Sequence, residues 1–407
     1  MRAGEFMPRV NAMIGLVSKL DSPYITVHQD RCQLVRNRNA DCLRCASVCT
    51  SGCIAFDGEV LTITPENCIG CGTCATICPT CCLEAHHPND AEFLNECHAV
   101  WDACEGTVTI ACASSLAAAQ GLVDETRVVR VECLGRVEES ALTVLAAEGA
   151  AQVVLVHGDC SACPHQSGRV MLEQVIATER ELLTAWNCAL PIRVSDRFPG
   201  KCRAQDVGYD ASRRAAFEEG GASLGRTITA AAGYALEEAF GTGHQAPDAA
   251  PKRTYPKVMD DGTLPHFVPD RRERLLDALA ELGEPDDVMI STRLWGHVII
   301  DTDRCKSCRM CATFCPTGAL RPFGKDDGSG KPFGVEHYPG DCVKCRCCEN
   351  ICPVHAIEIS EEVFARDMLA GMTDAYEMRP VAIKRSSAHT ILEIQKTQFT
   401  IPEVYER

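Results

Sequence analysis

One cysteine pattern, repeated along the chain, limits what the chain can fold into. Cys-x2-Cys-x2-Cys-x3-Cys-Pro occurs in the runs that begin at Cys68, Cys305 and Cys342. This spacing lets three thiolates surround one corner of an iron–sulfur cube, while the fourth, before Pro, points to the cube of a second run. Two such runs therefore predict two crossed [4Fe–4S] sites. Structural zinc takes only four ligands, so a pair of four-cysteine runs ending in Cys-Pro exceeds the usual zinc pattern.

The two C-terminal runs complete each other. Each predicted cluster takes three cysteines from one run and the last cysteine of the other. The predicted ligands are Cys305, Cys308, Cys311 and Cys352 for one cube, and Cys342, Cys345, Cys348 and Cys315 for the other. Cys347 is an extra thiol, which we expect to fill a small buried space.

The run at Cys68 needs a partner, and residues 31–53 supply one in altered form. Three of their cysteines repeat the second half of the motif, and Cys32 completes it if seven extra residues loop out between the first and second ligands. The predicted ligands are Cys32, Cys42, Cys45 and Cys78 for one cube, and Cys49, Cys68, Cys71 and Cys74 for the other. Cys53 is expected in the core. An alternative, in which Cys53 replaces Cys32, breaks the crossed pattern but stays open.

Both cysteine-rich regions, residues 24–85 and 297–360, resemble bacterial-type two-cluster ferredoxins in their cysteine motifs. The resemblance implies the small α+β ferredoxin-like fold at both ends of the chain. It also implies electron transfer rather than bond chemistry, because a cube held entirely by thiolates has no open position for a substrate.

Between these regions the sequence alternates between strand and helix patterns. Short β-branched runs at 107–112, 127–133 and 152–160 are separated by stretches with helical spacing. The alternation predicts a central α/β domain with a parallel sheet, in which ligands gather at the carboxyl ends of the strands. Each of the three runs ends in a cysteine, and a fourth follows. These four thiols, Cys112, Cys133, Cys160 and Cys163, predict a metal site that suits zinc, [2Fe–2S] or [4Fe–4S].

The segment 131–169 resembles the small iron–sulfur (delta) subunit of methyl-viologen-reducing hydrogenases. The shared pattern is a cysteine, one residue and Gly-Arg, then a strand ending in Gly and Cys, then Cys and Gly. That family carries a [2Fe–2S] cluster and passes electrons between a hydrogenase and the flavin subunit of heterodisulfide reductase, so the resemblance implies a [2Fe–2S] cluster on the four central cysteines. The last two cysteines are closer together than in the family, and Pro164 stands where the family has His. His165 is therefore an outside candidate for a ligand.

These observations divide the chain into five parts. They are a ferredoxin-like domain with two [4Fe–4S] clusters (1–106), an α/β [2Fe–2S] domain (107–200), a helical and linker region (201–284), a second ferredoxin-like domain with two [4Fe–4S] clusters (285–360) and a C-terminal tail (361–407). Within the third part we expect a surface linker at 241–256 and an amphipathic helix that ends at Gly283. The tail is expected to be a docking arm or a helix followed by a loose end.

Composition limits the partners and the location. A formal net charge of −16 argues against a nucleic-acid surface, which needs clustered Lys and Arg. No apolar run approaches the roughly 20 residues of a membrane span, so direct insertion into a membrane is not expected. The 28 cysteines lie in a long chain without a recognisable leader cleavage site, which favours a reducing cytoplasm over a secreted disulfide scaffold.

The cysteines therefore predict a function. Five clusters without a phosphate loop, catalytic triad or flavin motif indicate a multi-cluster electron-transfer subunit of an anaerobic oxidoreductase complex, without an active site of its own. Its expected partners are a catalytic subunit and a flavin-containing or hydrogenase-type subunit, as in heterodisulfide reductase systems. The alternative is a stand-alone iron–sulfur oxidoreductase with its site in the central domain, which would need an open ligand position.

Overall fold

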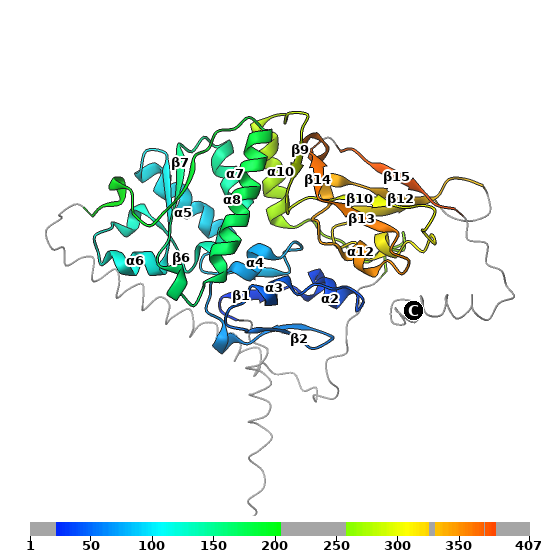
Figure 1. Ribbon diagram of the computed structural model, residues 1–407, viewed down its shortest axis with the longest axis horizontal. Coiled ribbons are helices and arrows are strands. Elements are labelled where there is room, and N and C mark those ends of the chain that lie inside the picture. Colours follow the sequence, from blue (N-terminus) through cyan, green and yellow to red (C-terminus); the bar gives the residue numbers. More distant parts are fainter. Residues whose placement is uncertain (1–21, 205–257, 325–329, 370, 380–407) are drawn as a thin grey trace, which may run out of the picture. The chain divides into compact units, whose positions relative to one another are not determined.

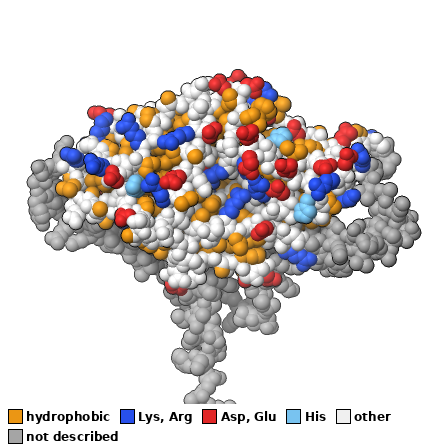
Figure 2. Space-filling model, in the orientation of Figure 1, with side chains coloured by type: hydrophobic (Ala, Val, Ile, Leu, Met, Phe, Trp, Pro, Cys, Tyr) orange, Lys and Arg blue, Asp and Glu red, His pale blue; other side chains and the backbone are white. Residues whose placement is uncertain are grey.

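The computed structural model describes residues 22–204, 258–324, 330–369 and 371–379. The linker predicted at 241–256 lies outside these residues. Among the described residues, none of the helices combines the length and hydrophobicity that crossing a bilayer requires. On the face in Figure 2, acidic and basic side chains lie interspersed, with hydrophobic side chains between them.

Two small antiparallel sheets frame the N-terminal cysteine region. Strand β1 (Ile25–Val27) pairs with β4 (Leu83–Ala85), and β2 (Ile54–Phe56) pairs with β3 (Leu61–Ile63). The helices of this region are short: α2 (Gln33–Arg36), α3 (Arg44–Ser47) and α4 (Thr73–Ile77). The core under them combines a few aliphatic residues with five cysteines, Cys32, Cys45, Cys53, Cys74 and Cys82. A core with so few aliphatic side chains gains stability from whatever its thiols bind.

The central region contains a parallel four-stranded sheet in the order β6-β5-β7-β8. Its strands are β5 (Thr107–Cys112), β6 (Val129–Val131), β7 (Gln152–Val156) and β8 (Ile192–Ser195). Every residue of β5 is buried, as expected for a parallel strand that is covered on both faces. The three predicted strands are present, and β8 was not predicted.

Helices cover both faces of this sheet. Apolar residues of α5 (Asp90–Ala103), α7 (Glu139–Ala147) and α8 (Ser167–Ala185) form one large core with the sheet. On the other face, α6 (Ala113–Ala119) and the turn η6 (Gly200–Cys202) contribute to a smaller core. Figure 1 shows α7 and α8 side by side with α10 (Asp270–Leu282). Helix α10 confirms the predicted amphipathic helix, and Gly283 ends it at a positive φ of 104°.

The C-terminal region also pairs two strands beside short helices that contain cysteines, and it has further strands. Strand β10 (His297–Ile300) pairs antiparallel with β13 (Ile357–Ser360), around the helices α11 (Met310–Thr313) and α12 (Cys347–Ile351). A further sheet, β11-β12-β15, consists of Leu320–Phe323, Gly334–His337 and Asp374–Glu377. The pair β9 (Met289–Ser291) and β14 (Glu362–Phe364) packs with α8 and α10 in one core, which contains the buried Trp295.

The sequence predicts a docking arm or a helix with a loose end after residue 360, and residues 380–407 of this segment lie outside the described residues. Its described part forms β14, which pairs with β9, then the turn η8 (Ala365–Met368), and β15, which pairs with β12. The sequence pattern did not reveal this, because each strand is only three or four residues long.

Candidate metal centres

All four ferredoxin-type cysteine runs contain the same short helix, and the third cysteine of each run is its second residue. The helices are α3, α4, α11 and α12, and the cysteines are Cys45, Cys74, Cys311 and Cys348. The irregular run at 32–49 therefore folds in the register of the three regular ones. The turns η1 (Gln29–Arg31), η2 (Pro65–Asn67) and η7 (Pro339–Asp341) each stand directly before the first cysteine of a run.

The extra residues between Cys32 and Cys42 form α2, which contacts the C-terminal region. Gln33 Nε2 donates a hydrogen bond to the Cys345 carbonyl at 3.1 Å, and Arg36 Nη1 donates to the Pro265 carbonyl at 2.8 Å. Both side chains are buried. The insertion thus joins the two cysteine-rich regions to each other.

Group 1 consists of Cys32, Cys42, Cys45 and Cys78, which the sequence assigned to one cube. Burial, with the charges of the other three thiolates, raises the pKa of Cys45 to about 12, so the four sulfurs lie near one another. Hydrogen bonding from the single S–H of Cys82, shared between two of them, lowers the pKa of Cys78 to about 5 and that of Cys32 to about 7. Sequence reasoning did not give Cys82 this role, because the C-terminal runs have Ala at its position and Cys53, at the same position in the first run, is expected in the core.

Group 2 consists of Cys49, Cys68, Cys71 and Cys74. Burial first, and the charges of Cys71, Cys45, Cys68 and Cys49 next, raise the pKa of Cys74 well above its ordinary value. Cys53 Sγ lies 3.5 Å from Cys49 Sγ, beside group 2. Cys32, by contrast, lies with group 1, which favours Cys32 over Cys53 as the fourth member of that group.

The C-terminal cysteines form two similar sets. Group 4 consists of Cys315, Cys342, Cys345 and Cys348, and group 5 of Cys305, Cys308, Cys311 and Cys352. Within group 5, burial and then the charges of Cys308, Cys305 and Cys352 raise the pKa of Cys311. The last cysteine of a run accepts a backbone hydrogen bond from four residues on, as seen for Ala356 N to Cys352 Sγ and for Cys82 N to Cys78 Sγ, both at 3.3 Å. Such N–H···S bonds stabilise thiolate ligands.

Group 3, the central group, lies at the carboxyl edge of the parallel sheet. Cys112 ends β5, Cys133 follows β6, and η5 (Cys160–Ala162) with Cys163 follows β7. All four cysteines line one small pocket. Backbone N–H groups of Gly158, Gly135 and His165 donate to the sulfurs of Cys112, Cys133 and Cys163 at 3.3, 3.4 and 3.5 Å. Four thiols with N–H donors in one pocket form a donor set that fits an iron–sulfur cluster.

Three glycines keep this pocket open. A Cβ at Gly168 would lie less than 3.0 Å from Cys133 Sγ, one at Gly135 would lie 2.7 Å from the Gly168 Cα, and one at Gly158 would meet the Ser114 side chain. All three lie within the segment 131–169. The turn η4 (Leu134–Arg136) carries Gly135 close to Thr73 of α4, so the pocket borders the N-terminal cysteine region.

His165 lies at the same pocket. Its Nδ1 atom is buried without a hydrogen-bond partner. Its backbone N–H donates to Cys163, and its carbonyl lies 3.7 Å from the Cys133 sulfur. Four cysteines already line the pocket, so a cluster there has four thiol ligands without the histidine. The His165 ring lies beside these thiols.

The five groups follow one another without a gap. The charge of Cys71 raises the pKa of Cys133, which links group 2 to group 3, and the charge of Cys45 raises that of Cys74, which links group 1 to group 2. Two further charge effects link the C-terminal groups to the rest of the series. The charge of Cys42 of group 1 raises the pKa of Cys347, whose charge in turn raises that of Cys345 of group 4, and the charge of Cys311 of group 5 raises the pKa of Cys348 of group 4. The resulting order is 3–2–1–4–5.

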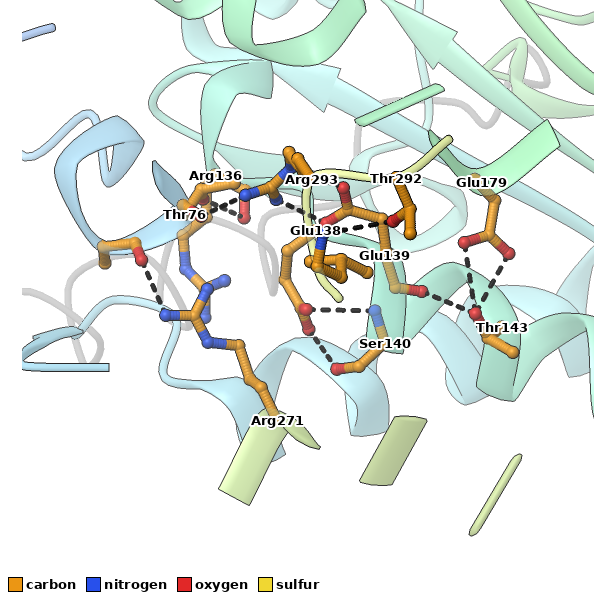
Figure 3. Close-up of polar contacts among 12 residues, drawn as sticks. Thr76, Arg136, Glu138, Glu139, Ser140, Thr143, Glu179, Arg271, Thr292 and Arg293 are labelled. Atoms are coloured by element: carbon orange, nitrogen blue, oxygen red, sulfur yellow. Dashed lines mark hydrogen bonds and ion pairs between the residues drawn. The ribbon is translucent and has the colours of Figure 1, made fainter. Parts of the chain in front are cut away.

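A polar network holds the three regions together beside groups 1 and 4 (Figure 3). Arg293, which follows β9, binds both carboxylate oxygens of Glu139 on α7, at 2.6 and 2.5 Å, and donates to the Thr76 carbonyl on α4 at 3.2 Å. Arg271 of α10 donates to the Ala75 carbonyl at 2.6 Å. These two arginines therefore fix the N-terminal, central and C-terminal regions relative to one another.

The same arginines line a pocket of about 650 Å³. Its wall includes Cys78 of group 1 and the neighbouring Cys81, together with carboxylates and cationic side chains. Behind it, Glu179 is fully buried and accepts a hydrogen bond from the Thr143 hydroxyl, 3.1 Å from both of its oxygens. Burial, and next the charge of Glu139, raises the pKa of Glu179 well above its ordinary value.

Comparison with protein families identifies two parts of the chain. Residues 304–356 match the 4Fe-4S dicluster domain, and residues 61–80 match the 4Fe-4S binding domain. The chain therefore carries two ferredoxin-type domains that bind 4Fe-4S clusters, which indicates an iron–sulfur electron-transfer role. A search of curated proteins gave no match to the chain.

Proposed function

We propose that the chain is an electron relay, with four [4Fe–4S] clusters on groups 1, 2, 4 and 5 and one [2Fe–2S] cluster on group 3. The observation that carries the proposal is the order 3–2–1–4–5: charges link groups 3, 2 and 1 and groups 4 and 5, and Cys347 and the Gln33 hydrogen bond to the Cys345 carbonyl lie between groups 1 and 4. Such clusters supply one-electron redox chemistry over a wide range of potentials. The protein holds them in series and insulates them by burial.

The two ends of this series are the places where partners would meet it. At one end Cys308 of group 5 is exposed, and at the other Cys160 and Cys163 of group 3 are half-buried. The inner group 4 is less accessible, with Cys315, Cys342 and Cys348 buried. Electrons would therefore enter at one end and leave at the other.

We infer that the partners are a catalytic subunit and a flavin-containing or hydrogenase-type subunit of an anaerobic oxidoreductase complex. The support is the central pocket, where the four cysteines and three glycines of the delta-subunit pattern lie together. A domain of that kind would receive or deliver electrons at group 3. The ferredoxin-type region with groups 4 and 5 would face the other partner.

Replacing Cys133 by Ala tests the proposal. The reduced variant should lose the [2Fe–2S] signal in electron paramagnetic resonance and keep four reducible cubes. In the assembled complex it should stop electron flow from donor to acceptor, while artificial dyes still reduce the ferredoxin-type clusters. The matched control is Cys188→Ala, since Cys188 is a half-buried cysteine outside the five groups. A Cys133→Ala variant that keeps every cluster, or keeps full turnover, would make the central domain a structural spacer.

The pocket of about 650 Å³ favours a second candidate, a stand-alone oxidoreductase. Its volume lies in the range typical of small-molecule sites, and Cys78 of group 1 forms part of its wall. Electrons from group 1 would then reduce a small molecule in the pocket. The dye-reduced chain, without partners, should in that case be reoxidised by a small-molecule acceptor, and Arg271→Gln should slow that reaction without changing the iron content.

A further inference from the structure

Three side chains that no cysteine group uses converge in the C-terminal region. They are His297 on β10, His337 on β12 and Asp374 on β15, and their ligand atoms all lie within 4.8 Å of one another. The Nδ1 atoms of His297 and His337 each lie 3.7 Å from Asp374 Oδ2. This separation is too long for a hydrogen bond, so the three side chains face one another without direct bonding.

His337 is the unusual member of this set. Its side chain is 0% exposed, and neither of its ring nitrogens has a hydrogen-bond partner. A buried polar group without a partner is costly, and a buried histidine normally bonds through at least one nitrogen. A buried ring without partners is held in its neutral form, since burial disfavours the charged imidazolium. Neutral imidazole is the form that binds a metal.

We propose that His297, His337 and Asp374 bind a divalent transition metal ion, with Zn²⁺ as the ion that suits them best. Two imidazole nitrogens and one carboxylate oxygen are the protein ligands of many three-ligand zinc sites. Ligand atoms around tetrahedral zinc lie roughly 3.3 to 3.4 Å apart at bond lengths near 2.0 Å, so the two 3.7 Å separations to Asp374 need to shrink by a few tenths of an ångström, and the two histidine nitrogens, within 4.8 Å of each other, need to approach as well.

The surroundings leave room for a fourth ligand. The side chains of His297 and Asp374 are 30% and 43% exposed, so the site opens to solvent on the side away from His337. Water would complete the coordination there. The site holds no cysteine, and its ligands come from strands of two different sheets, β10-β13 and β11-β12-β15. A bound ion would therefore tie β15, in the segment after residue 360, to the ferredoxin-type strands.

Without an ion, a hydrogen bond connects β15 to β10. Tyr376 donates a hydrogen bond to the Val298 carbonyl at 2.6 Å, next to the metal ligand His297. The strand also pairs with β12 from Gly334 to His337. Ion binding adds a third connection at the end of this pairing, where His337 faces Asp374. Metal binding should consequently slow the opening of β15.

The test uses the full chain, purified anaerobically with its iron–sulfur clusters and washed with a chelator. Zinc bound at equilibrium is measured by mass spectrometry, and its ligands by X-ray absorption at the zinc edge. We expect one zinc per chain in a nitrogen and oxygen environment. His297→Ala and Asp374→Asn should each weaken zinc binding at least 10-fold while iron content and cluster spectra stay unchanged. These partly exposed positions avoid the risk that a His337 variant fails to fold.

His98→Ala is the matched control. His98 Nε2 lies 2.7 Å from the Glu148 carboxylate, but this pair has no second histidine, so zinc binding should stay at the wild-type level. As a second measurement, zinc should slow hydrogen exchange in residues 374–377 of the wild type and not in Asp374→Asn. A sulfur shell around the zinc, or equal zinc binding by wild type, His297→Ala and Asp374→Asn, would overturn the proposal. Neither result would affect the relay, which uses none of these residues.

Discussion

Gly168→Ala should remove the central cluster and leave the other four in place. Gly168 lies in the first turn of α8, and the added methyl group would stand less than 3.0 Å from Cys133 Sγ. Atoms in van der Waals contact need about 3.5 to 4.0 Å, so the sulfur must move by at least about 0.5 Å. The methyl group cannot turn elsewhere, because Gly135 N and Thr73 Oγ1 would each already be 3.4 Å from it.

The free energies indicate that the protein still folds after this change, whereas the pocket loses its cluster. Alanine is favoured over glycine inside a helix by about 1 kcal/mol, and overpacking a well-packed site costs about 1 to 3 kcal/mol. The net destabilisation of the fold is therefore at most about 2 kcal/mol. The strain falls on the Cys133 thiolate, and even changes outside the ligand shell commonly weaken metal binding about 10- to 100-fold.

Iron analysis and electron paramagnetic resonance measure the result. With four cubes and one [2Fe–2S] cluster, the wild type should contain about 18 iron atoms and Gly168→Ala about 16. The [2Fe–2S] signal should disappear while the cube signals remain. Gly200→Ala is the control, since a Cβ there meets nothing within 4 Å. If Gly168→Ala retains the full iron content and an unchanged [2Fe–2S] signal, the pocket at group 3 is not the site of that cluster.

Two further predictions concern the N-terminal register and the junction between regions. Cys32→Ser should lower the iron content by up to about four atoms, whereas Cys53→Ser should leave it intact; the reverse result would place Cys53 among the ligands of group 1. Arg293→Met should destabilise the protein by about 3 to 5 kcal/mol, because the Glu139 side chain is only 1% exposed and would lose its partner. Hydrogen exchange in α7 and α10 should accelerate in this variant and largely recover in Glu139→Gln/Arg293→Met, and unchanged exchange in the single variant would contradict the expectation.

The features that the sequence predicted well are those encoded in neighbouring residues. The Cys-Pro runs each form a short helix with the third cysteine in a constant place, because the spacing itself fixes that loop. The three cysteines that follow β-branched runs meet at one sheet edge, since parallel strands present their carboxyl ends together. Helix α10 ends at Gly283 for an equally local reason.

Other elements carried a signal that we did not use. Helix α5 begins with Asn89, whose side chain accepts from Glu92 N while the Glu92 carboxylate accepts from Asn89 N. This capping box is visible in the sequence as Asn-x-x-Glu. Strand β8 is harder to see, because only Ile192 of its four residues is buried.

The histidine and aspartate site could not be predicted from the sequence. Its three ligands lie at positions 297, 337 and 374, each on a strand of four residues, and no local motif connects them. Only the pairing of β12 with β15 places His337 opposite Asp374. Cys82 is similar, since only the structure places it beside group 1, where it lowers the pKa of Cys78 and Cys32.

The insertion that disguises the N-terminal motif also explains how the two cysteine-rich regions meet. A regular run would place two residues between its first and second cysteines, whereas this chain forms α2 there. Arg36 of α2 is buried, which lowers the pKa of its guanidinium, and negative charge on the sulfurs of Cys347 and Cys315 and on Asp30 opposes that effect. A positive charge between groups 1 and 4 offsets part of the repulsion between two sets of thiolates. Helix α2 therefore accounts both for the irregular spacing between Cys32 and Cys42 and for the contact between groups 1 and 4 in the series 3–2–1–4–5.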